Sequence, residues 1–266
     1  MFTIRNLRPG ALSVLLAAAA PATHAATEDN PWGLQVYAGD SLGMHGDFST
    51  NRLTAVPDLG PLVPDLAGTA GSVALTTITY EDMYRSRYNL GAELSYAVSE
   101  NADAYARFGY NALDGETSTI GLIISPDLAK SDPIVGRFND TDMYSLMLGS
   151  RYYVPTGNSW RIFGGAALGA TRLHDMTGTL DIPDSSTTLA GLRFARATTV
   201  FSQSVEAGID YHAPQNVDLQ FTLAGEHMGA ARAGNDPQLA ALGFDTTHEG
   251  DGRWSFPLTL GATYRF

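Results

Sequence analysis

Between Arg253 and Phe266, apolar and polar residues alternate without a break. The apolar side chains occupy every second position, namely Trp254, Phe256, Leu258, Leu260, Ala262, Tyr264 and Phe266. A period of two places alternate side chains on opposite faces of a β-strand. Aromatic residues stand at both ends of the apolar row with aliphatic residues between them, which is the order on strands that face lipid. This segment therefore predicts a membrane-facing β-strand.

The same alternation recurs upstream in three pairs of segments, each pair joined by a short polar link. Two alternating segments joined in this way predict a β-hairpin. We expect the paired strands at 88–98 and 104–110, at 144–154 and 160–170, and at 205–211 and 217–223. A weaker strand at 32–38 comes before them and the 253–266 strand comes last, so that the predicted total is eight.

The connections between these strands alternate in length. Three short turns alternate with long stretches at 41–83, 113–141, 174–199 and 230–251. Short turns on one side and long loops on the other are typical of bacterial outer-membrane barrels, in which the turns are periplasmic. Hydrocarbon offers no partner to backbone N–H and C=O groups, so the first strand must pair with the last. The expected fold is all-β, an eight-stranded antiparallel up-and-down transmembrane barrel with four long extracellular loops; ten spanning strands, or a soluble β-sandwich or barrel, are the alternatives.

The start of the chain predicts export. Arg5 and Arg8 precede an apolar stretch at 11–22 and small residues at Ala25 and Ala26, so residues 1–25 read as a signal peptide and residues 26–266 as the barrel domain. No later segment has 18 uninterrupted apolar residues, the length of a spanning helix. Removing the two arginines would bring the net charge from −12 to about −14, which disfavours nucleic acid as a partner. The chain has no cysteine, so disulfides do not stabilise it.

The final residues, LTLGATYRF at 258–266, resemble the C-terminal signal by which the barrel assembly machinery recognises its clients. Thr259, Gly261, Tyr264 and Phe266 occupy the positions of that signal. The mature chain as a whole resembles the small eight-stranded barrels of the OmpA/OmpX kind. The resemblance implies assembly by that machinery during biogenesis. It does not extend to the periplasmic peptidoglycan-binding domain of the OmpA proteins, because the sequence ends at Phe266.

An eight-stranded barrel has an interior about wide enough for side chains to fill. The inward positions of the predicted strands carry charges of both signs, namely Glu93, Arg107, Arg151, Arg161, Glu206, Asp210, Glu226 and Arg265. Charges in a poorly screened interior need partners, so we expect structural ion pairs and a largely filled, polar lumen. A small pore or porin-like transport protein is the alternative function.

The histidines of the exported chain are His45, His174, His212, His227 and His248. They do not form a metal-ligand spacing such as H-E-x-x-H, and no G-x-S-x-G motif is present. We therefore predict no catalytic residue, no metal site and no cofactor. A hydrolase or lipid-modifying enzyme that uses His174, Asp175, Asp245 and His248 at the outer rim is a further alternative.

The expected function is envelope integrity and surface interaction through the extracellular loops, and we expect the protein to be a monomer. Outer-membrane lipids and lipopolysaccharide are the expected partners, and arginines predicted to face the outside could bind lipopolysaccharide phosphates: Arg85, Arg87, Arg137, Arg172, Arg193, Arg196, Arg232 and Arg253. Segments 72–80, 118–125 and 187–195 are rich in β-branched or apolar residues and are expected to extend strands above the membrane or to cap the barrel. An exposed edge there could bind a partner by strand addition.

Overall fold

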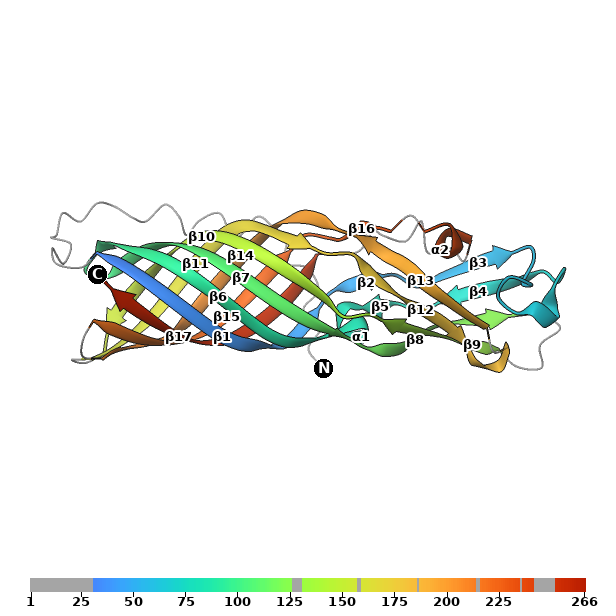
Figure 1. Cartoon of the computed structure of the whole chain (residues 1–266), viewed down its shortest axis with the longest axis horizontal. Helices are drawn as coiled ribbons and strands as arrows, with labels where there is room; N and C mark the ends of the chain where they lie inside the picture. Colours follow the sequence, from blue (N-terminus) through green and yellow to red (C-terminus); the bar gives the residue numbers. More distant parts are fainter. Residues whose placement is uncertain are drawn as a thin grey trace.

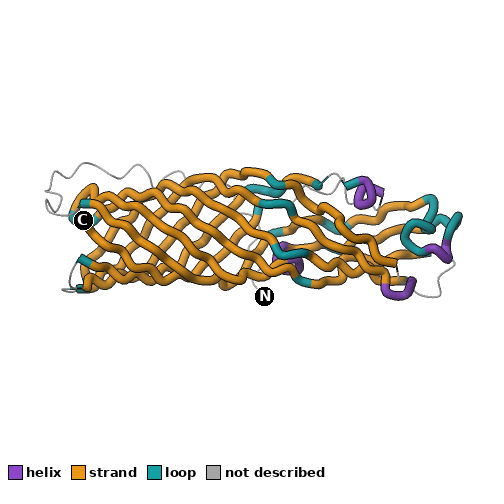
Figure 2. Tube along the Cα trace, in the orientation of Figure 1, coloured by secondary structure: helices purple, strands orange, loops and turns teal. Residues whose placement is uncertain are grey.

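The computed structural model describes residues 31–125, 131–156, 159–185, 187–213, 216–234, 236–241 and 252–266. The predicted signal peptide lies outside the described residues, as do Asp245 and His248. Strands account for most of what is described (Figure 2). No helix in the described part of the chain has the length and apolarity to cross a membrane.

Eight strands form a closed antiparallel barrel, which occupies the left half of Figure 1. Around the barrel their order is β1, β17, β15, β14, β11, β10, β7 and β6, so that the first and last strands pair as predicted. Their bounds are β1 (Trp32–His45), β6 (Tyr84–Ser99), β7 (Ala102–Gly115), β10 (Thr141–Pro155), β11 (Trp160–Leu173), β14 (Thr198–Ala213), β15 (Val217–Met228) and β17 (Arg253–Arg265). The all-β barrel predicted from the alternation is confirmed.

A second sheet stands on the barrel at the end opposite the short turns (Figure 1). We call it the outer sheet. Its seven strands follow the order β16, β13, β12, β9, β8, β4 and β3. Their bounds are β3 (Arg52–Val56), β4 (Gly71–Leu75), β8 (Thr117–Ile124), β9 (Asp132–Phe138), β12 (Met176–Ile182), β13 (Thr187–Arg196) and β16 (Arg232–Ala233).

Short elements complete the outer half. They are the strand pair β2 (Asp47–Ser49) and β5 (Ile78–Thr79), the helices α1 (Tyr80–Met83) and α2 (Pro237–Ala241), and the 3₁₀ turns η2 (Pro64–Leu66) and η3 (Pro183–Ser185). Thr79 caps α1, because its hydroxyl accepts the N–H of Asp82 while the Asp82 carboxylate accepts the N–H of Thr79.

Four strands of the outer sheet prolong barrel strands. One residue separates β7 from β8 and β13 from β14, and two residues separate β9 from β10 and β11 from β12. The predicted loops at 113–141 and 174–199 are therefore largely two long hairpins. Segments 118–125 and 187–195 largely form β8 and β13, which prolong β7 and β14, so for these two the expected strand extension is confirmed. Segment 72–80 holds most of β4 and all of β5, which α1 separates from β6, so it does not prolong a barrel strand.

The barrel exposes large apolar side chains on its outer surface. On β1, Trp32, Leu34 and Val36 are exposed while Gln35 between them is buried. On β17, Leu260 and Tyr264 are exposed, and so is Phe266 directly after it, as the alternation predicted. The same holds around the barrel for Leu94, Tyr96, Val98, Leu146, Leu148, Tyr152, Trp160, Ile162, Phe201, Ile209, Leu219 and Leu223. An apolar belt of this extent does not occur on soluble monomers, and it identifies the surface as lipid-facing.

Aromatic residues border the belt at both ends. Near the short turns, the rings of Trp32 and Tyr96 lie 4.9 Å apart and those of Trp160 and Tyr211 lie 4.7 Å apart. Toward the outer sheet, the rings of Tyr110 and Tyr144 lie 5.0 Å apart. Two aromatic girdles with aliphatic side chains between them mark the two interfaces of a bilayer.

Pro257 occupies one of the inward positions of β17. In the structure it lies opposite Ser41, where the pairing of β1 with β17 shifts register before Met44. A proline cannot donate a ladder hydrogen bond, so its place beside a β-bulge costs the sheet little.

Candidate functional site: the lumen and the outer sheet

Four charged side chains from four strands form a closed arrangement across the middle of the lumen, which we call the central square. Arg107 Nε lies 2.9 Å from Glu93 Oε2, and Arg107 Nη2 lies 2.7 Å from Glu206 Oε2. Arg151 Nη1 lies 2.6 Å from Glu93 Oε1, and Arg151 Nε lies 2.5 Å from Glu206 Oε1. Each carboxylate therefore bridges both guanidinium groups. The square carries no net charge, which is the condition under which buried charges are tolerated.

Tyr105 packs against the central square. Its ring centroid lies 4.3 Å from the Arg151 guanidinium carbon and 4.7 Å from that of Arg107, and its hydroxyl donates to Glu206 Oε1 at 3.1 Å. The ring supplies cation–π contacts to both arginines, and the hydroxyl occupies a further carboxylate lone pair. Arg151, Glu93 and Glu206 are 3 %, 2 % and 5 % exposed, so water reaches none of them freely.

A second group of charges fills the lumen near the short turns. Arg265 Nε lies 2.6 Å from Asp218 Oδ2, and its Nη2 lies 3.1 Å from Asp103 Oδ2. Arg161 binds Asp210 and also lies 3.4 Å from Asp218 Oδ2. His212 and Tyr153 complete the group, because His212 Nδ1 is 2.6 Å from Asp218 Oδ1 and Tyr153 donates to Asp103.

The structure places seven of the eight inward charges expected from the sequence in these two groups: Glu93, Arg107, Arg151 and Glu206 in the central square, and Arg161, Asp210 and Arg265 near the turns. Asp103 and Asp218 were missed. Asp103 lies one residue before the strand predicted at 104–110, and Asp218 lies within the strand predicted at 217–223. Both have inward parity, so applying the alternation to every position would have found them.

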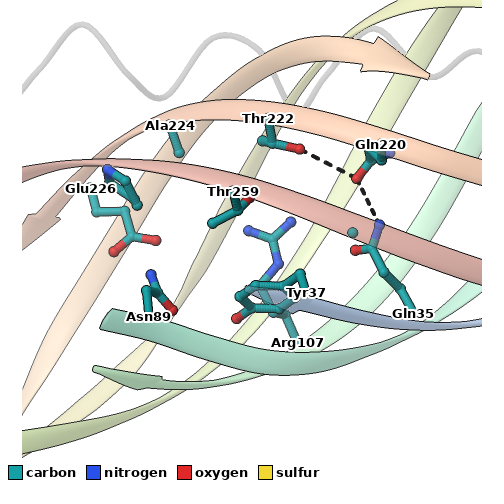
Figure 3. Close-up of a pocket in the computed structure, with 11 residues that line it drawn as sticks. Gln35, Tyr37, Asn89, Arg107, Gln220, Thr222, Ala224, Glu226 and Thr259 are labelled. Carbon is teal, nitrogen blue, oxygen red and sulfur yellow. Dashed lines mark hydrogen bonds between the residues drawn. The ribbon is translucent and has the colours of Figure 1, made fainter. Parts of the chain in front are cut away.

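Glu226 stands apart from both groups and lines two small chambers between the central square and the outer sheet. The first has a volume of about 20 Å³, and in Figure 3 Glu226, Asn89 and Arg107 project into it together with Tyr37. The second, of about 30 Å³, adjoins it and reaches Met143 and Met228. Spaces of this size each hold about one or two water molecules. The described lumen therefore has polar layers of side chains with two small, adjoining chambers among them.

Two glutamines bound the first chamber on the side of the short turns. Gln35 Nε2 donates to Gln220 Oε1 at 3.0 Å, and the Thr222 hydroxyl donates weakly to the same oxygen at 3.4 Å (Figure 3). Gly261 makes room for this pair, because a Cβ at that position would lie 2.7 Å from Gln35 Nε2.

Arg253 closes the lumen at its outer end. We expected Arg253 among the arginines that face lipopolysaccharide, and the structure corrects this: the residue is 2 % exposed. Its guanidinium contacts the sulfur of Met143, lies 3.6 Å from that of Met228, and faces the Tyr80 ring at 5.5 Å. The sequence pattern explains this burial, because Arg253 occupies one of the alternate positions of β17 whose side chains face inward.

An apolar core lies beyond Arg253, enclosed by the outer sheet. Its members come from the outer strands, from α1 and from the ends of the barrel strands. They include Phe48, Leu59, Val73, Ile78, Met83, Leu113, Ile120, Ile123, Ile134, Phe138, Leu173, Leu180, Ile182, Leu192 and Phe194, and each of these is at most 4 % exposed. The outer half is therefore packed like a soluble domain and covers the mouth of the barrel.

The described histidines lie against different neighbours. His45 Nδ1 is 3.4 Å from Glu81, His174 contacts Asp142, His212 contacts Asp218, and the His227 ring lies 5.0 Å from that of Trp254. Among the described residues, no three or more His, Cys, Asp or Glu side chains gather in a group that could hold a metal ion.

The residues of the C-terminal assembly pattern divide between the two faces of β17. Tyr264 and Phe266 are 56 % and 51 % exposed on the lipid side, whereas Thr259 and Gly261 line the first chamber. Phe266 also closes the barrel, because its N–H donates to the Trp32 carbonyl at 2.9 Å and its carbonyl accepts the Trp32 N–H at 3.2 Å. Recognition of these residues by an assembly machinery stays a prediction.

Comparison with known proteins found no matching family model and no matching curated protein. Solved structures do match. Neisserial surface protein A is 14 % identical, with 88 % of this chain and 97 % of that chain covered at a TM-score of 0.40. The outer-membrane protein AlkL in lipid bilayers is 17 % identical; the match covers 93 % of this chain and 95 % of that chain at a TM-score of 0.42. The outer-membrane protease OmpT from Escherichia coli is 10 % identical; the match covers 92 % of this chain and 99 % of that chain at a TM-score of 0.38.

These likenesses are distant. The fold rests on the chain's own closed barrel, on the apolar belt around it and on the two aromatic girdles. With these features the chain has the fold of the small eight-stranded β-barrels of the Gram-negative outer membrane.

Proposed function

We propose that this protein is a non-conducting outer-membrane barrel whose task is contact at the cell surface and support of the envelope. The barrel anchors the chain, and the outer sheet makes the contacts. The observation that carries the proposal is the folded outer sheet with its own apolar core, standing on a barrel whose lumen is filled.

The lumen supports the non-conducting part of the proposal. An ion crossing the barrel would have to pass the charges near the turns, the central square, Arg253 and the apolar core in succession. Side chains in the central square meet at hydrogen-bond distance, so there is no aqueous gap between them. Opening a path would require breaking buried ion pairs, which is costly when the partners stay buried.

The length of the strands supports the surface part. A membrane-spanning strand needs about 9–11 residues. The barrel strands have 12 to 16 residues, and the hairpins β8–β9 and β12–β13 continue beyond them. A chain that served only as a membrane plug would need none of this, whereas a rigid sheet held away from the bilayer suits binding.

Charged residues at the outer rim support contact with lipopolysaccharide. Arg85 Nη2 lies 3.0 Å from Glu116, and Arg87 lies 3.6 Å from Asp114, with both arginine side chains more than half exposed. Exposed guanidinium groups bind phosphates well. The neighbouring carboxylates can bind divalent cations that also bind those phosphates. Such pairs would tie the barrel to the phosphate layer of the outer leaflet.

A trimmed barrel tests the proposal. Residues 47–79, 117–138 and 176–196 are replaced by short Gly-Ser turns, and folding is checked by the shift of the gel band after boiling. We expect cells that carry the trimmed barrel to lose adherence to immobilised lipopolysaccharide, to epithelial cells and to one another. If trimming prevents folding, Fab fragments raised against the β3–β4 hairpin serve instead on the intact protein and should block adherence. Unchanged adherence in the folded trimmed variant, or under the Fab, would overturn the proposal.

The proposal includes no catalytic step. Lipid A from cells with and without the protein should therefore give the same mass spectrum. A change in acylation would replace this proposal with the lipid-modifying alternative.

A further inference from the structure

The outer sheet has two edges, and only one of them is protected. The β16 edge has two residues, and the Arg196 guanidinium donates to the Ala233 carbonyl there at 3.1 Å. The opposite edge is β3, with five residues, and within the described residues it pairs with β4 alone. Proteins usually protect such edges with charges, prolines or very short strands. β3, with the sequence RLTAV, has one charge, Arg52, at its end.

An apolar surface adjoins this edge on the outward face of the sheet. Leu53 is 66 % exposed and lies directly across from Ala74, which in turn lies across from Leu122. Ala55, also exposed, begins a second row that crosses Ser72 to reach Ile124. Leu122 and Ile124 are 38 % and 42 % exposed, so the apolar rows end abruptly at the β3 edge.

The sequence of β3 is complementary to itself in antiparallel register. Centred on Thr54, such a pair places Leu53 opposite Ala55 of the second copy, and Arg52 opposite Val56. No like charges face each other, and the apolar rows continue from one sheet into the next. The two Thr54 residues would lie directly opposite each other. The Thr54 hydroxyl is buried and has no hydrogen-bond partner in the described structure, and a Thr–Thr pair across strands would supply one.

The direction of β3 fixes where the second copy must stand. β3 lies toward the end of the molecule away from the short turns and runs roughly along its long axis (Figure 1). An antiparallel partner strand therefore belongs to a barrel that points the opposite way. Such a barrel is embedded in a facing membrane, because copies in one membrane share one orientation.

We infer that β3 is a self-adhesive edge, which pairs with β3 of a second copy of this chain on a neighbouring cell. This inference rests on the proposed function and names its partner. A single pair of five-residue strands covers far less than the roughly 1,000 Å² that a stable complex needs. Adhesion therefore comes from many weak contacts between two membranes, in which each contact raises the effective concentration for the next.

Variants with charged residues in β3 test the proposed register of the β3–β3 pair. One variant carries Leu53→Lys and Ala55→Lys, and the other carries Leu53→Glu and Ala55→Glu. Both positions are exposed, so both variants should fold, which the gel shift after boiling checks. In the proposed pair, position 53 faces position 55, so each variant places like charges opposite each other twice. A mixture of the two variants places opposite charges there instead.

Cells displaying each form are labelled with one of two dyes, mixed, and scored for clusters that contain both dyes. Wild-type cells should cluster. Each double variant alone should lose at least ten-fold in clustering, and the lysine and glutamate variants mixed together should regain most of the wild-type level. Thr117→Glu with Thr119→Glu is the matched control for the glutamate variant. It adds the same charge at two exposed positions of β8 that pair with β9 and lie away from the β3 edge, so these cells should cluster as wild type.

The outcomes separate this inference from the proposed function. Suppose that cells with the trimmed barrel fail to cluster, and that mixing cells with the lysine variant and cells with the glutamate variant does not restore clustering. The β3 edge is then not the contact, and the proposed function stands. If the glutamate variant alone clusters as wild type, the inference is likewise overturned. If cells with the trimmed barrel cluster as wild type, both the inference and the proposed function are wrong.

Discussion

Three inward-facing aromatic rings lie on glycines directly across from them in the neighbouring strand. The pairs are Tyr37 with Gly91, Tyr105 with Gly149, and Phe163 with Gly208. A Cβ on each glycine would come within 2.2 to 2.6 Å of the ring or its hydroxyl. Glycine is therefore required by close approach and not by backbone conformation. The sequence shows glycines recurring in the strands but gives no register, so these pairs could not be predicted from it.

Gly208→Ala should lower the free energy of unfolding by about 1–3 kcal/mol, because the new methyl overlaps the Phe163 ring and the Phe221 carbonyl. Gly164→Ala, on the outer face of β11, is the control: its nearest atom is 3.9 Å away, so a change within about 0.5 kcal/mol is expected. Urea titration of the folded band in lipid bilayers measures both. Equal losses in the two variants would contradict the close-approach argument.

The central square gives a second residue-scale prediction. Glu206→Ala leaves Arg151 and Arg107 with Glu93 as their shared partner, and removing one member of a buried ion network costs about 3–5 kcal/mol. Adding Arg151→Met should restore part of that loss, because it removes the excess charge.

The control for this prediction is Asp181→Ala in the outer sheet. Its partner Arg137 is 65 % exposed in its side chain, and exposed pairs contribute about 0–1 kcal/mol. The same urea titration applies. A Glu206→Ala loss no larger than that of the control would show that the square is not a buried network.

At the scale of elements, the alternation predicted all eight barrel strands but not their lengths. Glu116, for example, is the single residue between β7 and β8, and a strand prediction based on periodicity ends at such a break. The composition of segments 118–125 and 187–195 showed that they were not ordinary loops. Their pairing into one sheet, and the apolar core beneath it, depend on contacts between distant hairpins that one sequence does not contain.

The C-terminal strand carries the element-scale prediction. Deleting Phe266 removes the two backbone hydrogen bonds to Trp32 and the last position of the assembly pattern. The amount of folded protein in the outer membrane should fall several-fold, while adherence per folded molecule stays unchanged. Tyr152→Ala, which removes an equally exposed girdle aromatic away from the terminus, should leave the yield near wild type. Normal assembly of the shortened chain would contradict the prediction.

The whole molecule combines two interiors of opposite character. Within the membrane the interior is polar and the surface apolar, whereas in the outer half the core is apolar, as in a soluble domain. The two meet at Arg253, between the chambers and the apolar core. Both arrangements follow from one rule, that each face of a strand matches the medium that it contacts. Together they support the proposal that the barrel does not conduct.

Electrical recording tests this central claim most directly. Purified protein is reconstituted into planar bilayers at defined salt, and the same preparation is shown to be folded by the shift of its gel band after boiling. We predict no stable conductance steps above the lipid baseline, because the central square and the apolar core close the lumen in series. A steady, ohmic open-channel current that scales with the amount of folded protein would contradict the account.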